Sequence, residues 1–459
     1  MSGQTVGRKH PGLHVAYGRP IEHMRPARRA GTAGRVAGAL SLCLFGATLL
    51  YVLIGFEPFQ HTVVTYGADT STVNRWVWLG LLILALPVLW LRRGTVLRLL
   101  RALWPLLLLY AWFAASTVWA LDPPVSLRRF LFYGVALTVF LAIAAGIRNA
   151  RTGHLVLLLG TGTVVLIDVL SGLLAPGVAM TPLGLAGIHP QKNTAGEVGL
   201  YAVLAAATYL PLARRRVGRA GTAALALLAL ALLVLARSAT STTIALALLV
   251  SLLPLIRLLR RSALTVGVAG AVVAAVLGVL LFFYLGWAGV EGRDALAPLA
   301  NVTFTRRTDV WNFVLSEVAK RPMLGAGFSS FWDIDPAIQP SLYKGFWFAS
   351  PTEYTNESHN GYLDILVTTG WIGLALAVAV LGRAIWLALR QVARGPAPLL
   401  PTAAFHLTFL LGFAVHNLME STYFMPNTAF GTLFLFSAFQ LEMWRLAQPA
   451  PAARPVRVA

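Results

Sequence analysis

Two arginines and a histidine lie near the two ends of a long polar segment, residues 305–370, between apolar runs. Arg306 and Arg307 come near its start, and His359 lies close to its end. A guanidinium is always charged and can bind a phosphate through two hydrogen bonds. An imidazole is well matched to take a proton from a hydroxyl near neutral pH. These residue types predict a site that holds a phosphorylated substrate beside a catalytic histidine.

Arg307 is the stronger catalytic candidate of the arginine pair, because it stands four residues before Trp311 in an R-x-x-x-W pattern. Arg306 and Trp311 are then candidate substrate-binding residues. The alternative is that the arginines anchor the chain at the membrane interface. His359 is followed by Asn360, a further substrate-binding candidate, where an apolar helix is expected to begin. A lone histidine is more often structural, but this polar company favours a catalytic role.

Arg237, in the stretch ARSATSTT, is expected at the outer end of an apolar span. It is a candidate second phosphate clamp in the catalytic set, helped by the hydroxyls of Ser238, Thr240 and Ser241 near the start of the next helix. The alternative is an ordinary interfacial arginine whose charge reaches the headgroups.

The stretch GIHPQKNTAGE supplies another polar cluster, in which His189, Lys192 and Asn193 are predicted to bind substrate. Glu197 follows inside an apolar helix, where an acid needs a partner. Two roles for Glu197 stay open: an ion pair with Lys192 or an arginine, or a direct part in the reaction. Asp168, deep in an earlier apolar run, has no visible partner and stays unassigned.

The stretch HNLMEST places His416 and Glu420 at the end of a late apolar run, where they are expected to hold the catalytic groups in place. No metal site is predicted, because the sequence contains no HExxH or CxxC motif. Asp333 and Asp335 in WDIDP could hold a cation, but a turn or helix cap explains them equally well. No cofactor is expected, since there is no P-loop or nucleotide fold.

The composition excludes a soluble globular protein: 57% of the 459 residues are hydrophobic, 12% are charged, and the mean hydropathy is +0.71. The net charge of +20 does not indicate nucleic-acid binding, because the basic residues form short clusters between apolar runs. Cys43 lies alone in an apolar run, which excludes an internal disulfide.

Apolar runs long enough to cross a bilayer predict an all-α polytopic membrane protein of about 12 transmembrane helices. The expected spans are 36–56, 76–91, 103–120, 130–147, 154–174, 194–212, 220–236, 243–256, 263–287, 361–382, 401–419 and 428–445. Five alternate turns are rich in arginine, so the positive-inside rule makes that side and both termini cytoplasmic.

This topology divides the chain into five parts. They are a basic cytoplasmic tail without signal-peptide features (1–35), nine helices (36–287), a large periplasmic catalytic loop (288–360), three helices (361–445) and a second cytoplasmic tail (446–459).

Within the large loop, apolar residues at helical spacing predict an amphipathic helix at the membrane surface, from about Asp309 to Lys320. Pro322 ends it, and Gly325 and Gly327 make a turn. Five aromatic residues follow and suit either an interfacial belt or a sugar-stacking surface: Tyr343, Phe346, Trp347, Phe348 and Tyr354.

Together, RTDVWNFVLSEVAKRPMLGAGFSSFW, SHNGYLDILVTTGWIGLAL and GIHPQKNTAG resemble the O-antigen ligase and polysaccharide polymerase family of bacterial membrane glycosyltransferases. The first two stretches carry an R-x-x-x-W helix, a glycine turn, a histidine that opens a helix and a following Gly-x-x-Gly. Met323-Leu324 after Pro322 is a small departure, and the match at Arg237 is the loosest. The third stretch is similar to the His-Lys-Asn element of exopolysaccharide polymerases.

The resemblance implies a metal-independent, inverting glycosyltransferase of the inner membrane that uses a glycan on undecaprenyl pyrophosphate at the periplasmic face. Arg307 and Arg237 would hold the pyrophosphate, and His359 would act as general base or orient the acceptor hydroxyl. A polymerase of exopolysaccharide or O-antigen is favoured; a ligase acting on lipid A core is the alternative. Other partners would be membrane lipid and envelope polysaccharide assembly proteins. A transporter of lipid-linked sugars is the alternative of another class, disfavoured because the polar groups collect on one face.

Overall fold

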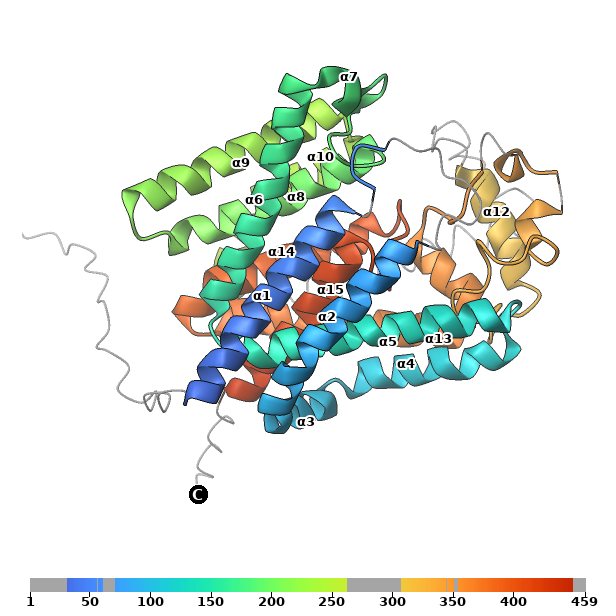
Figure 1. The fold of residues 1–459 in the computed structure, drawn as a ribbon, viewed down its shortest axis with the longest axis horizontal. Helices are drawn as coiled ribbons and strands as arrows, with labels where there is room; N and C mark the ends of the chain where they lie inside the picture. Colours follow the sequence, from blue (N-terminus) through green and yellow to red (C-terminus); the bar gives the residue numbers. More distant parts are fainter. Residues whose placement is uncertain are drawn as a thin grey trace, which may run out of the picture.

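The computed structural model describes residues 31–55, 57–60, 71–261, 307–343, 345–350 and 354–448. In these ranges the chain is a helical bundle (Figure 1). The longer helices, in chain order, are α1 (Thr32–Ile54), α2 (Thr72–Leu91), α3 (Arg93–Ala102), α4 (Trp104–Ser116), α5 (Pro123–Gly146), α6 (Ala150–Leu174), α8 (Lys192–Tyr209), α9 (Arg216–Ala236), α10 (Ala239–Arg261), α12 (Arg307–Val318), α13 (Gly361–Arg394), α14 (Leu400–His416) and α15 (Ala429–Ala447).

The remaining regular elements of the described ranges are short. A four-residue helix, α7 (Pro176–Ala179), leads into a hairpin of two-residue antiparallel strands, β1 (Met180–Thr181) and β2 (Gly184–Leu185), in which Met180 pairs with Leu185. Single 3₁₀ turns are η2 (Thr117–Trp119), η3 (Leu210–Leu212), η5 (Pro340–Leu342), η6 (Trp347–Ala349) and η7 (Ala397–Leu399). The predicted all-α class is confirmed.

Nine helices of the described ranges are long and apolar enough to cross a membrane, and a tenth span arises if α3 and α4, which meet at 77°, are taken together. The chain is therefore a multi-pass membrane protein. The predicted span 428–445 forms α15, which is not among the nine, and the predicted span 263–287 lies outside the described residues. The span expected at 130–147 begins earlier, at Pro123, since Asp122 caps the helix by accepting from the Val125 N–H at 3.1 Å.

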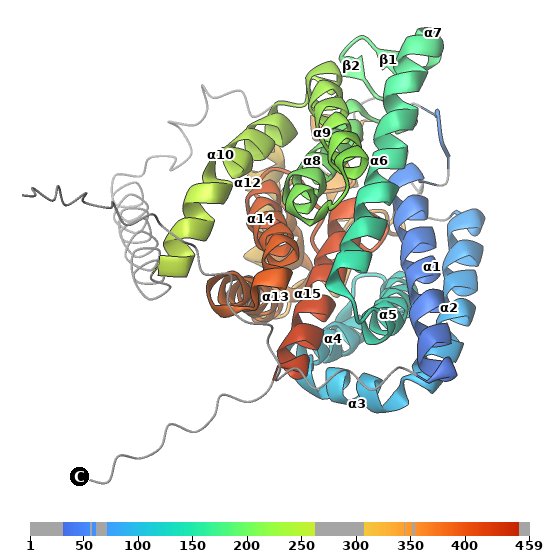
Figure 2. The same cartoon turned by 90° about the vertical axis from the view of Figure 1, so that its left-hand side faces the viewer.

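The bundle has an inner and an outer set of helices. α8 is the most enclosed candidate span, with 72% of its apolar window buried, whereas α2 has only 22% buried. Figure 2 shows α8, α14 and α15 inside, with α2 at one edge and α10 at the other. Leucines such as Leu84 and Leu86 on α2 are more than half exposed, as expected of side chains that face lipid.

The polar loop packs as a small domain against the start of α13. Val310, Val314 and Val318 on one face of α12 are buried with Phe331, Trp332 and Phe348, and with Leu366 and Val367 of α13. The predicted amphipathic helix is confirmed as α12, and its apolar face is covered by protein. Figure 1 shows α12 at the end of the bundle where α13 begins.

A break in α13 joins this domain to the bundle. Gly370 has φ +68° and ψ −174°, so the helical hydrogen bonding is interrupted there. The loop fills the break: the Ala326 N–H donates to the Val367 carbonyl at 2.8 Å, and the Trp371 N–H donates to the Pro322 carbonyl at 2.9 Å. The indole of Trp112 on α4 donates to the Thr369 carbonyl at 3.0 Å. Loop and neighbouring helix thus satisfy backbone groups that lipid could not.

Gly370→Ala is expected to destabilise the protein strongly. A Cβ at this position would lie 2.1 Å from the Met323 carbonyl oxygen, and the positive φ disfavours any other residue. The measurement is the thermal unfolding of the purified protein in detergent. Gly382→Ala is the matched control, because it lies in the same helix with no atom within 4 Å of the added carbon. Equal unfolding temperatures for the two variants would contradict the prediction.

Candidate functional site

A cavity of about 410 Å³ lies where four distant parts of the chain meet. These parts are the end of α1, the start of α8, the segment just before α13, and the turn between α14 and α15. Six of the predicted site residues line it together: His189, Asn193, Glu197, Arg307, His359 and Glu420. Side chains separated by more than two hundred positions in the sequence are thus brought to one chamber.

Arg307 is the first residue of α12 and points toward the turn that follows α14. Its Nη2 lies 2.8 Å from Glu420 Oε1, and its Nη1 donates to the Met419 carbonyl. The side chains of Arg307 and Glu420 are 15% and 14% exposed. The arginine is therefore mostly buried, lines the cavity and is paired there with an acid.

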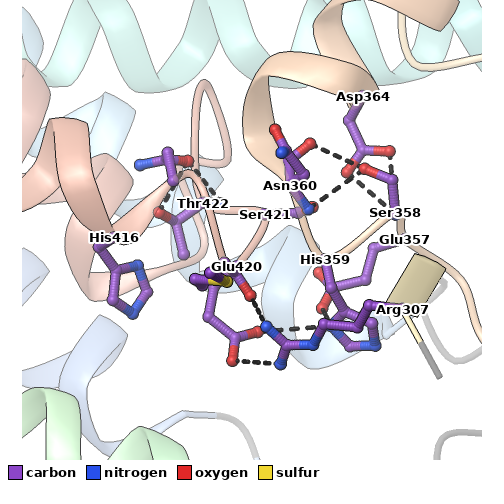
Figure 3. A network of polar contacts seen from close by, with 12 residues as sticks. Arg307, Glu357, Ser358, His359, Asn360, Asp364, His416, Glu420, Ser421 and Thr422 are labelled. Atoms are coloured by element: carbon purple, nitrogen blue, oxygen red, sulfur yellow. Dashed lines mark hydrogen bonds and ion pairs between the residues drawn. The ribbon is translucent and has the colours of Figure 1, made fainter. Parts of the chain in front are cut away.

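His359 contacts the other carboxylate oxygen of the same acid (Figure 3). Its Nδ1 is 2.7 Å from Glu357 Oε1 and 3.4 Å from Glu420 Oε2. Glu420, predicted to have a supporting role, thus contacts both catalytic candidates. His359 also has φ +50°, an uncommon backbone conformation for a non-glycine residue, which the structure must hold in place.

The surrounding residues explain how His359 is held. The side chain of Asn360 caps α13 by accepting from the N–H groups of Tyr362 and Leu363, and its own N–H donates to Ser421 Oγ. The indole of Trp311 donates to the Ser358 carbonyl at 2.9 Å. Asn360 and Trp311, predicted to bind substrate, are therefore engaged in fixing the segment that carries His359, and neither lines the cavity.

The charges of the cluster shift two pKa values in opposite directions. Burial alone would lower the pKa of His359, but hydrogen bonds and charge from Glu357 and Glu420 outweigh it and raise this pKa to about 10. Burial likewise opposes ionisation of Glu420, yet His359 and Arg307 lower the pKa of this carboxyl to about 2. At neutral pH the histidine is an imidazolium and Glu420 a carboxylate.

This electrostatic state bears on the predicted chemistry. An imidazolium has no lone pair with which to take a proton, so the resting cluster disfavours His359 as a simple general base. It favours the other expected role, in which His359 orients a hydroxyl or stabilises negative charge. Arg307 and His359 then present two cations to one cavity, separated by a carboxylate that a stronger anion could displace.

Glu357, His359 and Glu420 also form a group whose ligand atoms lie within 4.8 Å of one another, and this pattern could hold a metal ion. The geometry fits a shared proton better. Two ligands on one tetrahedral zinc, each about 2.0–2.2 Å away, lie roughly 3.4 Å apart, whereas Nδ1 and Glu357 Oε1 are 2.7 Å apart. Arg307 already neutralises Glu420. We assign no metal to this cluster.

The GIHPQKN stretch reaches the cavity from the start of α8. His189 is buried, and its Nε2 lies 3.0 Å from Asp168 Oδ2; Asp168 Oδ1 accepts from the Ile188 N–H at 3.0 Å. Asp168, which the sequence left unassigned, is therefore the residue that shapes this stretch. Asn193 lines the cavity, but Lys192 does not; its Nζ donates to the Arg237 carbonyl at 3.1 Å.

Glu197 also points into the cavity, where its partners differ from those expected. Its Oε1 is 3.5 Å from His416 Nε2, and its Oε2 accepts from Tyr201 at 3.4 Å. The alternative of an ion pair with Lys192 is wrong, because Lys192 turns toward Arg237. His416 is buried and stacks on Phe430 at 4.0 Å, so it supports Glu197 and has no contact with His359 among the contacts of the described residues.

The second predicted clamp, Arg237, is not brought to the cluster. It ends α9 in a left-handed conformation with φ +52°, its side chain is exposed, and it does not line the cavity. Arg306 lies outside the described residues. Within them, Arg307 is the arginine that touches the cluster around Glu420.

Sequence reasoning missed Glu357, which stands two residues before His359 and makes its shortest contact. The signal was present in NESHN, since an acid beside a histidine can orient the imidazole, but the intervening turn could not be foreseen. It also missed the support of this segment by Asp333, whose carboxylate accepts from Tyr354 and Asn356 at 2.6 and 3.0 Å. In the WDIDP stretch, the carboxylate of Asp333 is therefore engaged in hydrogen bonds within the protein.

Comparison with known families gives one match, in the middle of the chain. Residues 223–378, about a third of the chain, match the model of the O-antigen ligase family, and this stretch includes Arg307 and His359. No curated protein matches the sequence. The family match supports a membrane protein that processes glycans, and for the family in general it implies a lipid-linked glycan donor and a lipid A core acceptor. The comparison thus agrees with the resemblance seen in the sequence motifs: residues 223–378 are similar to the O-antigen ligase family.

Proposed function

We propose that this protein transfers glycan from an undecaprenyl-pyrophosphate-linked donor to a hydroxyl acceptor at the periplasmic face of the bacterial inner membrane. The observation that supports it most directly is the Arg307–Glu420–His359–Glu357 cluster on the wall of the 410 Å³ cavity. Two cations beside one displaceable carboxylate suit a diphosphate that gains charge as it leaves.

In the proposed reaction, the donor diphosphate displaces Glu420 from Arg307 and takes its place. The acceptor oxygen attacks the anomeric carbon from the side opposite the diphosphate, so one C–O bond forms as the other breaks and the configuration inverts. His359, as the imidazolium, orients the hydroxyl. The hydroxyl proton passes to the carboxylate of Glu420, which the diphosphate has displaced from Arg307. The leaving diphosphate is stabilised by Arg307 and requires no protonation.

The acceptor decides between two variants of this chemistry. We favour a polymerase, which adds the glycan to another lipid-linked repeat unit of exopolysaccharide or O-antigen, because Asn193 and His189 of the GIHPQKN stretch line the same cavity as Arg307. A ligase that uses lipid A core is the second candidate. It is supported by the matching family, which is described as O-antigen ligase.

The test is a gel profile of envelope glycans from a deletion strain complemented with wild type or with His359→Ala. Loss of long chains, with single repeat units still transferred, would identify a polymerase. Accumulation of long lipid-linked chains that never reach the acceptor would identify a ligase. A wild-type profile from His359→Ala would refute the proposed site.

Removal of divalent metal is expected to leave glycan transfer unchanged. Arg307 and the proton shared by His359 and Glu357 supply the charge that a metal would otherwise provide. The measurement is transfer by the purified protein from a lipid-linked donor, before and after treatment with EDTA. Activity that is lost with EDTA and restored by one metal would instead place an ion between Glu357, His359 and Glu420.

The proposed orientation predicts that alkaline phosphatase fused after Leu342 is active, because this position lies in the loop domain beside α12. A fusion after Arg394, at the far end of α13, should be inactive. Phosphatase activity in colonies reports both. The opposite pattern would place the Arg307–His359 site on the cytoplasmic side and exclude this donor.

A further inference from the structure

A second cavity, of about 330 Å³, lies between α2 and α5, which pack against each other. Its polar side is formed by the guanidinium residues Arg75, Arg128 and Arg129. Its other side is apolar and includes Leu79, Leu131 and Val135. We name it the α2–α5 groove. It combines a strongly basic end with a hydrocarbon wall, on two helices that are candidate membrane spans.

The arginines of the groove differ in what they bind. Arg129 is engaged with the loop domain, since its Nη1 donates to the carbonyls of Ser329 and Trp332 at 2.7 and 2.8 Å. Arg75 and Arg128 are exposed, and no ion pair or side-chain hydrogen bond joins either to another residue within the described parts of the chain. Two uncompensated guanidinium groups at one mouth attract an anion, and a phosphate is the anion they fit best.

The apolar wall faces the lipid. Leu131 is 57% exposed and Leu79 is 37% exposed on the surfaces of α5 and α2. An arginine pair is also unexpected at this end of the bundle, because α2 and α5 begin on the side predicted to be periplasmic, where basic residues are usually scarce. A ligand that suits both features carries a phosphate on an apolar chain.

The groove adjoins the cavity that holds Arg307 and His359. Asn74 and Asn427 line both chambers. Both asparagines are fixed: Asn74 Oδ1 accepts from Tyr51 at 2.8 Å, and Asn427 Oδ1 accepts from the Trp78 indole at 3.1 Å. A phosphate held at Arg75 and Arg128 would therefore lie at the lateral entrance of the chamber that contains Arg307 and His359.

We propose that the α2–α5 groove binds the phosphate end and the first chain units of a membrane-embedded lipid phosphate, and that it is the lateral port through which such a substrate or its lipid product passes. This inference rests on the proposed function, to which it adds the place where the lipid is held. Isoprenoid diphosphates and acyl-chain phospholipids share this chemistry.

The test is photo-crosslinking of the purified protein in nanodiscs, which needs no turnover. One arm uses a diazirine-bearing undecaprenyl diphosphate without sugar, and the other uses a diazirine-bearing phosphatidylglycerol; peptide mass spectrometry locates the label. Labelling of α2 and α5 by the first lipid alone assigns the groove to the isoprenoid diphosphate. Labelling by both lipids assigns it to lipid phosphates generally. Labelling by phosphatidylglycerol alone would overturn the port, because the lipid of the proposed substrate would then be excluded from the groove.

The double variant Arg75→Gln/Arg128→Gln should reduce labelling of α2 and α5 by about tenfold or more, as loss of charge-assisted contacts implies. Leu131→Trp should block the groove, whereas Leu127→Trp, one turn earlier on α5 and not in its lining, should label as wild type. No label in α2 or α5, or equal label in the arginine variant, would overturn the proposal.

The same experiment separates this proposal from the proposed function. Arg307→Ala should retain labelling of the groove although it loses glycan transfer. If transfer depends on Arg307 while the groove takes no label, the port is wrong and the enzyme stands. If the groove takes label while no transfer is found, the port stands and the proposed function is wrong.

Discussion

Replacing Arg307 by alanine is expected to lower glycan transfer by about 10²–10³-fold, the usual loss when one preorganised group that stabilises developing charge is removed. Arg307 holds Glu420 at 2.8 Å in a mostly buried site, and within the described residues it is the arginine that contacts this acid. Its loss would also leave Glu420 paired with His359 alone. The measurement is the rate of transfer from a lipid-linked donor by protein of matched purity.

Two variants control this result. Arg307→Lys keeps the charge but loses the two-pronged guanidinium, and should recover only part of the rate. Arg321→Ala removes an exposed arginine of the same loop domain, whose Nη1 reaches only the Trp119 carbonyl at 3.4 Å, and should be as active as wild type. Equal losses in Arg307→Ala and Arg321→Ala would show that the effect is not local to the site.

Glycan transfer is expected to stay level from about pH 6.5 to 9 and to fall as the pH approaches 10, because the hydrogen bonds of His359 with Glu357 and Glu420 raise its pKa to about 10. The working form is then the imidazolium. If His359 were the base instead, the rate would rise with pH over this range. Measured rates across the range decide between the two roles.

The stability of the protein should follow the same titration. The pKa of His359 is higher in the folded state than its ordinary value of about 6.5, so its stabilising effect is complete below this value and is lost as the pH rises through about 10. Glu357→Gln removes the 2.7 Å partner and should move the loss of activity to lower pH. An unshifted profile in Glu357→Gln would contradict the assignment.

The sequence predicted the membrane class, most spans and the two central residues, because apolar run length and residue type are local properties. It predicted α12 and the glycine turn for the same reason. Sequence reasoning did not predict the partners of side chains that meet across the fold. Asp168 and His189 are 21 positions apart, and Glu197 meets His416 across the bundle, so neither pair has a periodic signal.

At Arg237 the sequence predicted a site residue that the structure places outside the cavity. Its residue type and its place at the end of an apolar run matched the expected clamp, yet its side chain is exposed and outside the cavity. Trp311 and Asn360 stand beside the chemistry in the sequence, but their hydrogen bonds to Ser358, Tyr362 and Leu363 make them supports. Proximity in sequence therefore identified the right segment without separating the residues that face the cavity from those that position it.

The break at Gly370 determines how the outer loop can be exchanged between related proteins. Because Ala326 and Pro322 bond to Val367 and Trp371, the loop and the first three turns of α13 form one unit. A chimera joined at residue 360 would combine the loop of one protein with the helix break of another. The loop residues that bond to Val367 and Trp371 would then come from a different protein. Crossovers placed after Trp371 keep the unit whole, so that an exchanged loop brings with it the backbone that supports it.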